Sequence, residues 1–129
     1  KLFISRRNSF RSMPNYDAVE SFFEHKGYQI ISPDKFTLYE KFLIFRNATH
    51  VVGPLSSGFT NLFFCKKKTK ALIMMNFQKI FEPYAGFIAD NFGIEITNIC
   101  GLDVKSSDYN SSFFIPLEKI QVACDELGF

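Results

Sequence analysis

Short apolar runs alternate with amphipathic segments along the whole chain. The apolar runs have the length and the Val, Ile and Phe content of strands, and they cover residues 1–5, 28–32, 50–53, 71–75 and 94–99. Residues 71–75 are apolar at every position, which is typical of a strand covered on both faces of its sheet. Phe113 and Phe114 predict a further short strand piece.

The segments between these runs predict helices over residues 15–26, 37–47, 59–65, 80–92 and 116–127. Asn15 is expected to cap the first helix, and Gly27 to close it. Thr37 and Glu40 have the spacing of a capping box. Residues 101–112 are polar and predict an irregular segment.

Alternating strands and helices predict an α/β fold in a single domain, residues 1–129. The expected architecture is three-layered, with a mostly parallel sheet of about five strands between helices. Ligands of such open sheets bind beyond the carboxyl ends of the strands, at the point where the strand order reverses. Three polar segments follow predicted strands, at residues 5–7, 32–34 and 53–57.

The stretch 50–64 is the principal candidate site. A buried strand leads through Gly53 into the small residues Ser56, Ser57 and Gly58, and a helix opens directly afterwards. Free backbone N–H groups and the helix dipole favour an anion at such a turn. We therefore expect it to hold the phosphates of a nucleotide. The alternative is a plain strand-to-helix connection, because the motif is neither GxGxxG nor a P-loop.

Arg6 and Arg11 follow the first strand, and their guanidinium groups could fork onto diphosphate oxygens. Alternatively, one of them pairs with Asp17 or Glu20 on the following helix. Asn61 lies one turn into the third predicted helix and is expected to brace the turn by a hydrogen bond. The candidate phosphate-binding residues are therefore Arg6, Arg11, Gly53, Ser56, Ser57, Gly58 and Asn61.

Composition narrows the function classes. The net charge of +2 does not suggest a nucleic-acid partner, and no apolar run reaches the ~20 residues of a membrane span. The three cysteines lack metal-site spacing, so free thiols are expected and no metal site is predicted. No carboxylate pair indicates acid/base catalysis. The chain begins at Lys1 rather than Met, which is consistent with a piece of a longer protein.

Several short motifs resemble glycosyltransferase family 61 in their order and separations. They are Ile4-Ser-Arg6, Arg11-x-x-x-Asn15, Ser32-Pro33, Phe36-Thr-Leu-Tyr-Glu40, Phe45-x-x-Ala48 and Val52-Gly-Pro-x-x-x-Gly-Phe-Thr-Asn-Leu-Phe-Phe64. The motifs span residues 2–64, and the order of strands and helices continues the resemblance to the end of the chain.

The resemblance implies a Rossmann-like domain, the C-terminal donor-binding half of a GT-B-type architecture. It implies an inverting transferase that uses a nucleotide-sugar donor, such as a UDP-sugar, with no metal or further cofactor. The acceptor would be a glycan or a protein, as in capsular polysaccharide biosynthesis. An N-terminal domain of the same chain would supply the acceptor side and the catalytic base. The implied compartment is the cytoplasm in a bacterium and the Golgi or ER lumen in a eukaryote.

Two departures from the family pattern fall near the candidate site. Leu55-Ser56-Ser57 stands where the pattern has His-Gly-Ala, and Lys41 stands where it favours Gln. They indicate either lost catalytic competence or altered donor binding, and an isolated domain is expected to bind nucleotide weakly without turnover. The competing hypothesis is a non-catalytic Rossmann-like module that serves assembly or protein interaction. An exposed aromatic patch or a filled cleft would favour that hypothesis.

Overall fold

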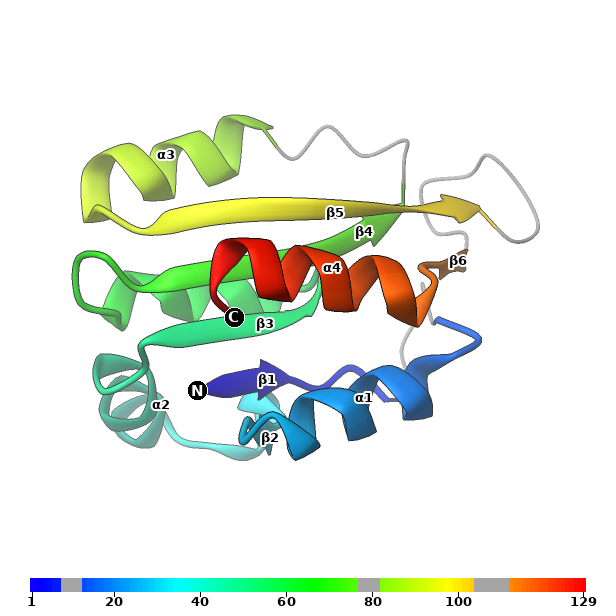
Figure 1. Cartoon of the computed structure of the whole chain (residues 1–129). Coiled ribbons are helices and arrows are strands. Elements are labelled where there is room, and N and C mark those ends of the chain that lie inside the picture. The colour runs from blue at the N-terminus through cyan, green and yellow to red at the C-terminus, as the bar shows by residue number, and fades with distance from the viewer. Residues whose placement is uncertain (8–12, 77–81, 104–111) are drawn as a thin grey trace.

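A computed structural model describes residues 1–7, 13–76, 82–103 and 112–129 of the chain. Its centre is a six-stranded sheet with the order β2-β1-β3-β4-β5-β6 (Figure 1). The strands are β1 (Leu2–Ile4), β2 (Gln29–Ile31), β3 (His50–Pro54), β4 (Lys70–Asn76), β5 (Glu95–Asp103) and β6 (Phe113–Phe114). Strands β1 to β5 pair in parallel, and β6 runs antiparallel to β5. The predicted mostly parallel α/β fold is confirmed, with a sixth strand at one edge.

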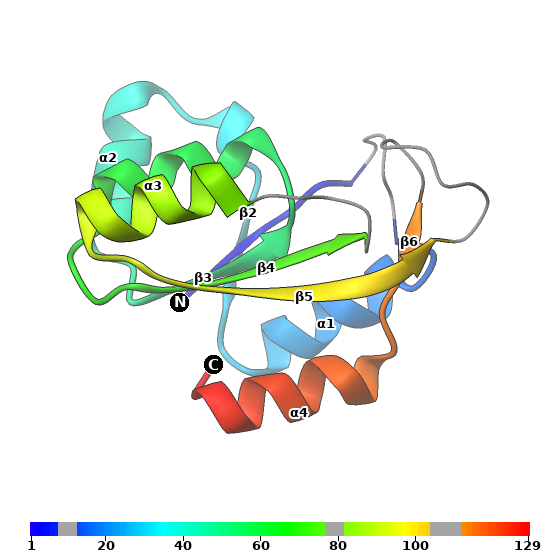
Figure 2. The ribbon, with the colours of Figure 1, turned by 90° about the horizontal axis from the view of Figure 1, so that it is seen from above.

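Helices cover both faces of this sheet (Figure 2). The α-helices are α1 (Tyr16–His25), α2 (Leu38–Arg46), α3 (Glu82–Phe92) and α4 (Leu117–Leu127), and two 3-10 helices are η1 (Pro33–Lys35) and η2 (Ser57–Phe64). Helices α2 and α3 lie on one face of the sheet, and α1 and α4 lie on the other. This arrangement gives the expected three layers.

The strands supply side chains to both faces in alternation. Ala71, Ile73 and Met75 of β4 pack into one buried cluster together with residues of α2, η2 and α3. Leu72 and Met74, their neighbours on the same strand, pack into a second cluster with residues of α1 and α4. A strand buried on both faces must be apolar at every position, which explains the uninterrupted apolar run in the sequence.

The helix ends match the sequence signals in part. Thr37 and Glu40 form the predicted capping box. Gly27 follows α1 with a φ of +80°, the left-handed conformation in which glycine is favoured. Asn15 stands at the start of α1 but does not cap it: its amide Nδ2 donates to the Ile115 carbonyl at 2.8 Å, and its Oδ1, the atom that would accept from a helix N–H, has no hydrogen-bond partner among the described residues. The prediction of an Asn15 cap was therefore wrong.

Two elements differ from their predicted extent. The helix after the candidate turn is a 3-10 helix rather than an α-helix. Strand β5 continues to Asp103, so residues 101–103 of the predicted irregular segment are a strand. Gly101 makes this possible, because a Cβ there would lie 2.5 Å from the carbonyl oxygen of Phe114 in β6. The predicted start of the fourth helix, at residue 80, lies outside the described residues.

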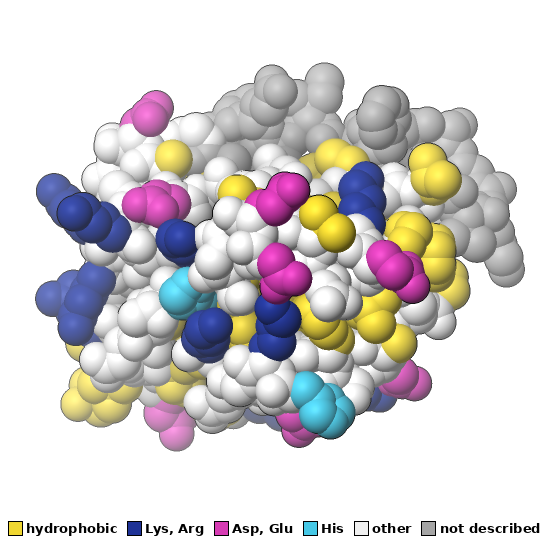
Figure 3. All heavy atoms as spheres, viewed as in Figure 1, with side chains coloured by type: hydrophobic (Ala, Val, Ile, Leu, Met, Phe, Trp, Pro, Cys, Tyr) yellow, Lys and Arg dark blue, Asp and Glu magenta, His cyan; other side chains and the backbone are white. Residues whose placement is uncertain are grey.

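The surface over α1 and α4 carries charges of both signs with hydrophobic side chains between them (Figure 3). Lys26 and Asp125 form one ion pair there, at 3.1 Å. All three cysteines are free; Cys65 and Cys124 are buried and Cys100 is half-buried. Among the described residues, none of the helices has the length and apolarity that a bilayer crossing requires.

Candidate functional site

An open cleft lies at the carboxyl ends of the central strands. Strand β1 pairs with β2 on one side and with β3 on the other, so the strand order reverses around β1. The cleft has a volume of about 820 Å³ and lies at this reversal. It is lined by residues 4–7, 32–35, 41, 56–58, 60 and 61.

The three polar segments predicted from the sequence meet at this cleft. Arg6 enters from the end of β1, and Ser56, Ser57, Gly58 and Asn61 enter from the turn and first residues of η2. Of the other two candidates, Gly53 does not belong to the lining, and Arg11 lies outside the described residues. Any binding role for these residues stays a prediction.

Packing against β1 explains both candidate glycines. A Cβ at Gly53 would lie 2.6 Å from the backbone oxygen of Ile4, and a Cβ at Gly58 would lie 2.9 Å from the Ile4 side chain. The absence of a side chain at each position lets β3 and η2 approach β1 closely. Gly53 thus shapes the floor beneath the cleft, whereas Gly58 also lines the cleft itself.

The turn between β3 and η2 is braced by its own hydrogen bonds. Asn61 donates through Nδ2 to the Gly58 carbonyl at 2.8 Å, so the predicted brace is confirmed. Thr60 donates through Oγ1 to the Ser57 carbonyl at 2.7 Å. The Ser56 hydroxyl is buried and has no hydrogen-bond partner among the described residues. A preformed turn with an unused polar group suits the binding of a polar ligand.

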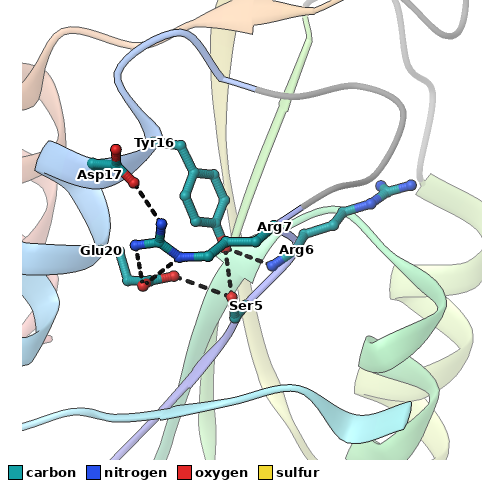
Figure 4. A network of polar contacts seen from close by, with 6 residues as sticks. All are labelled: Ser5, Arg6, Arg7, Tyr16, Asp17 and Glu20. Carbon is teal, nitrogen blue, oxygen red and sulfur yellow. Dashed lines mark hydrogen bonds and ion pairs between the residues drawn. The ribbon is translucent and has the colours of Figure 1, made fainter.

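Arg6 connects the end of β1 to this turn. Its guanidinium donates through one terminal nitrogen to the Leu55 carbonyl, and its backbone N–H donates to the Tyr16 hydroxyl. In Figure 4 the Arg6 side chain extends away from Glu20. The positively charged guanidinium of Arg6 therefore lies at the cleft, close to the turn that follows β3.

Arg7, rather than Arg6, pairs with the carboxylates of α1 (Figure 4). Its guanidinium lies 2.7 Å from Glu20 Oε1 and 2.8 Å from Asp17 Oδ1. The hydrogen bond to Glu20 is the main cause that raises the pKa of Arg7. Ser5 donates to the other Glu20 oxygen at 3.1 Å and accepts from the Tyr16 hydroxyl at 3.1 Å. This network anchors residues 5–7 to α1.

Two lysines of the cleft were not among the predicted site residues. Lys35 of η1 and Lys41 of α2 both line it. Position 41 stood out in the sequence as a departure from the family pattern. Its proximity to Arg6 and the turn could not be predicted, because it depends on how α2 packs on the sheet.

His50 lies at the other end of β3 and does not line the cleft. Its imidazole contacts the Thr49 hydroxyl at 2.9 Å and the Gly128 carbonyl at 3.0 Å. Burial is the main cause that lowers the pKa of His50.

Within the part of the chain that the structure describes, no three His, Cys, Asp or Glu side chains gather as a metal-binding group.

A protein-family model described as Glycosyltransferase 61 matches residues 1–72, more than half of the chain. The chain belongs to glycosyltransferase family 61. The match runs from β1 into β4 and includes every residue that lines the cleft. Membership of family 61 implies a sugar donor and an acceptor as substrates. Comparisons of the chain with curated proteins and with solved structures give no match.

The two departures from the family 61 pattern have different surroundings. Leu55, where the pattern has His, is 8% exposed and packs in the same buried cluster as Phe59 and Leu62. Its side chain does not line the cleft, and its backbone N–H donates to the Met74 carbonyl at 2.8 Å. Lys41, where the pattern favours Gln, lines the cleft. The substitution at position 55 thus adds to the core, and the one at position 41 adds a charge to the cleft.

Proposed function

We propose that this chain is the donor-binding half of an inverting, nucleotide-sugar-dependent glycosyltransferase that acts in polysaccharide or glycoconjugate biosynthesis. The observation that carries the proposal is the position of the cleft. It lies at the reversal of strand order around β1, and it joins Arg6 to the turn at residues 56–58 in a member of family 61. Clefts at this point of open α/β sheets hold nucleotides.

The donor diphosphate fits the turn and Arg6 chemically. The first N–H groups of η2 have no carbonyl partner within the helix, so they can donate to phosphate oxygens. The Arg6 guanidinium adds a permanent positive charge with several donors. These groups favour a bound diphosphate, and they favour it more as negative charge grows on it.

The reaction in this proposal is a single displacement. An acceptor hydroxyl oxygen attacks the anomeric carbon, and the bond from that carbon to the diphosphate oxygen breaks on the opposite face. The electron pair of the broken bond goes to the diphosphate, where Arg6 and the turn stabilise the added charge. The hydroxyl proton goes to a base that we assign to an N-terminal domain of the same chain, together with the glycan or protein acceptor site.

Isothermal titration of this chain with UDP, GDP and their sugars tests the proposal. We expect a nucleoside diphosphate to bind, and Arg6→Ala to weaken its binding at least about tenfold, since a charged hydrogen-bonding group is lost. Arg46→Ala is the matched control because Arg46 lies in the last turn of α2, outside the cleft lining. Absence of nucleotide binding, or equal binding by Arg6→Ala, would contradict the proposal.

A second candidate is a non-catalytic module that serves assembly, and one observation favours it. Large apolar side chains are exposed on the layer formed by α2, η2 and α3, namely Leu38 (70%), Tyr39 (69%), Phe42 (40%), Leu43 (43%), Phe63 (39%) and Phe87 (52%). Exposed apolar surface of this kind is typical of interaction faces. The open cleft favours the transferase instead. Nucleotide binding in the titration above decides between the two.

A further inference from the structure

We propose that Lys41 is a second cation of the donor site, which makes the cleft selective for two adjacent phosphates over one. The inference rests on the proposed function and deepens it, because it names a residue that would distinguish a nucleoside diphosphate from a nucleoside monophosphate. Arg6 reaches the cleft from β1 and Lys41 reaches it from α2, so the two charges come from separate walls.

The Lys41 ammonium group has no counter-ion among the residues that the structure describes. The Lys41 side chain is half-buried and lines the cleft. The backbone N–H of Lys41 donates to the Thr37 carbonyl at 3.0 Å, whereas its ammonium group forms no hydrogen bond or ion pair with any described residue. A lysine ammonium group is a compact point charge on a flexible stem, so it can turn to meet a negatively charged ligand that enters the open cleft.

Three carboxylates on α1 and α2 are engaged by other groups. Glu40, next to Lys41, accepts hydrogen bonds from the Thr37 backbone N–H at 2.8 Å and from the Thr37 hydroxyl at 2.7 Å. Glu20 and Asp17 are paired with Arg7. The basic side chains on the described part of the lining are those of Arg6, Arg7, Lys35 and Lys41, and the acidic one is that of Asp34. The described lining therefore carries a surplus of basic groups.

This surplus suits a diphosphate better than a monophosphate. The planar guanidinium of Arg6 can fork onto one phosphate, and the ammonium of Lys41 is a compact charge that can meet the next one. Gln, which the family pattern favours at position 41, would keep a hydrogen bond but supply no charge. The selectivity is therefore assigned to this chain's own substitution.

Calorimetric titration of the chain with UDP, UMP, pyrophosphate and inorganic phosphate tests this role. We expect UDP to bind about tenfold more tightly than UMP, and pyrophosphate about tenfold more tightly than phosphate. Lys41→Gln should remove most of both ratios and leave UMP binding nearly unchanged. The substitution should preserve α2, because Lys and Gln have similar helix propensities.

Arg46→Gln is the matched control, since it removes the same charge from the last turn of the same helix, outside the cleft. It should leave both ratios unchanged. If Lys41→Gln keeps the UDP-to-UMP ratio, the inference is overturned while the proposed function stands. If pyrophosphate binds with dependence on Lys41 and the nucleoside adds no affinity, the inference stands and the proposed function fails. If the wild-type chain binds neither UDP nor pyrophosphate, the inference is also overturned.

Discussion

Gly53 leaves the space in which β3 passes β1. The backbone oxygen of Ile4 would lie 2.6 Å from a Cβ at this position, far inside van der Waals contact. The Ile4 backbone cannot move away as a flexible side chain could, because β1 is paired with β2 on one side and with β3 on the other. The residue thus controls the distance between the two strands whose ends form the cleft.

Gly53→Ala is expected to destabilise the fold by about 1–3 kcal/mol, the usual cost of forcing atoms into a packed interior. Urea denaturation followed by circular dichroism measures the change. Gly86→Ala is the matched control, because Gly86 lies in α3 with nothing within 4 Å of the added Cβ. That variant should be more stable by roughly 0.5–1 kcal/mol, since alanine favours helix. Equal effects of the two substitutions would refute the packing explanation.

Arg6 and Arg7 show how neighbouring residues of one type come to differ. Arg7 is held by Glu20 and Asp17 of α1, whereas the Arg6 guanidinium reaches the Leu55 carbonyl at the turn. Figure 4 shows the two side chains pointing in different directions, with that of Arg7 toward α1 and that of Arg6 away from it. Arg7 therefore pairs with α1, and Arg6 is directed to the cleft.

At the scale of elements, the first turn of α2 contains both a stabilising capping box and a residue that lines the cleft. Its capping box satisfies the Glu40 N–H through the Thr37 hydroxyl and the Thr37 N–H through the Glu40 carboxylate. The helix so begun presents Lys41 to the cleft in its first turn. Fraying of this end would displace that lysine.

Thr37→Ala is expected to cost about 1 kcal/mol of unfolding free energy, because a helix N–H loses its acceptor. Thr37→Ser keeps the hydroxyl and should stay close to the wild type. Thermal denaturation of both variants gives the comparison. A wild-type melting curve for Thr37→Ala would show that the capping bond contributes nothing.

The same box gives α2 a dependence on pH. Hydrogen bonds from the backbone and side chain of Thr37 hold the pKa of Glu40 below its ordinary value of 4.5. Because the folded-state pKa is the lower one, the stabilisation is present above the unfolded-state value and is lost as the pH falls through the lowered one. The difference in stability between Thr37→Ala and wild type should therefore shrink in acid.

At the scale of the whole molecule, the two faces of the sheet form separate buried clusters, each with one buried thiol. Cys65 belongs to the cluster under α2, η2 and α3, and Cys124 belongs to the cluster under α1 and α4. Burial raises the pKa of Cys65 to about 12 and that of Cys124 to about 11. Thiolate, the reactive form, is therefore scarce at both sites near neutral pH.

Iodoacetamide at pH 8 should modify half-buried Cys100 before either of these thiols in the native protein. Both clusters share strands β1, β3 and β4, so Cys65 and Cys124 should become reactive at the same urea concentration. Pulsed alkylation with peptide mass spectrometry measures each site. Separate midpoints for the two thiols would show that the layers unfold independently.

Much of the fold was predictable because its signals are local. The apolar run at residues 71–75, the capping box at Thr37 and the glycine after α1 each depend on a few neighbouring residues. The spacing of apolar residues and the hydrogen bonds at helix ends involve residues only a few positions apart in the chain. The strands, the helices and the three-layer class could therefore be predicted from the sequence. The 3-10 form of η2 did not, because a short apolar helix takes the geometry that its packing allows.

Some features of the candidate site could likewise be predicted from the sequence, and others depended on the tertiary structure. The sequence by itself determined that small residues follow β3, that arginines follow β1, and that the chain resembles family 61. Only the tertiary structure decided that β1 lies between β2 and β3, which brings these strand ends to one cleft. It alone placed Leu55 in the core and Lys41 at the cleft. These relations join residues that are far apart along the chain, and packing of the helices on the sheet, rather than any local preference, determines which of them meet.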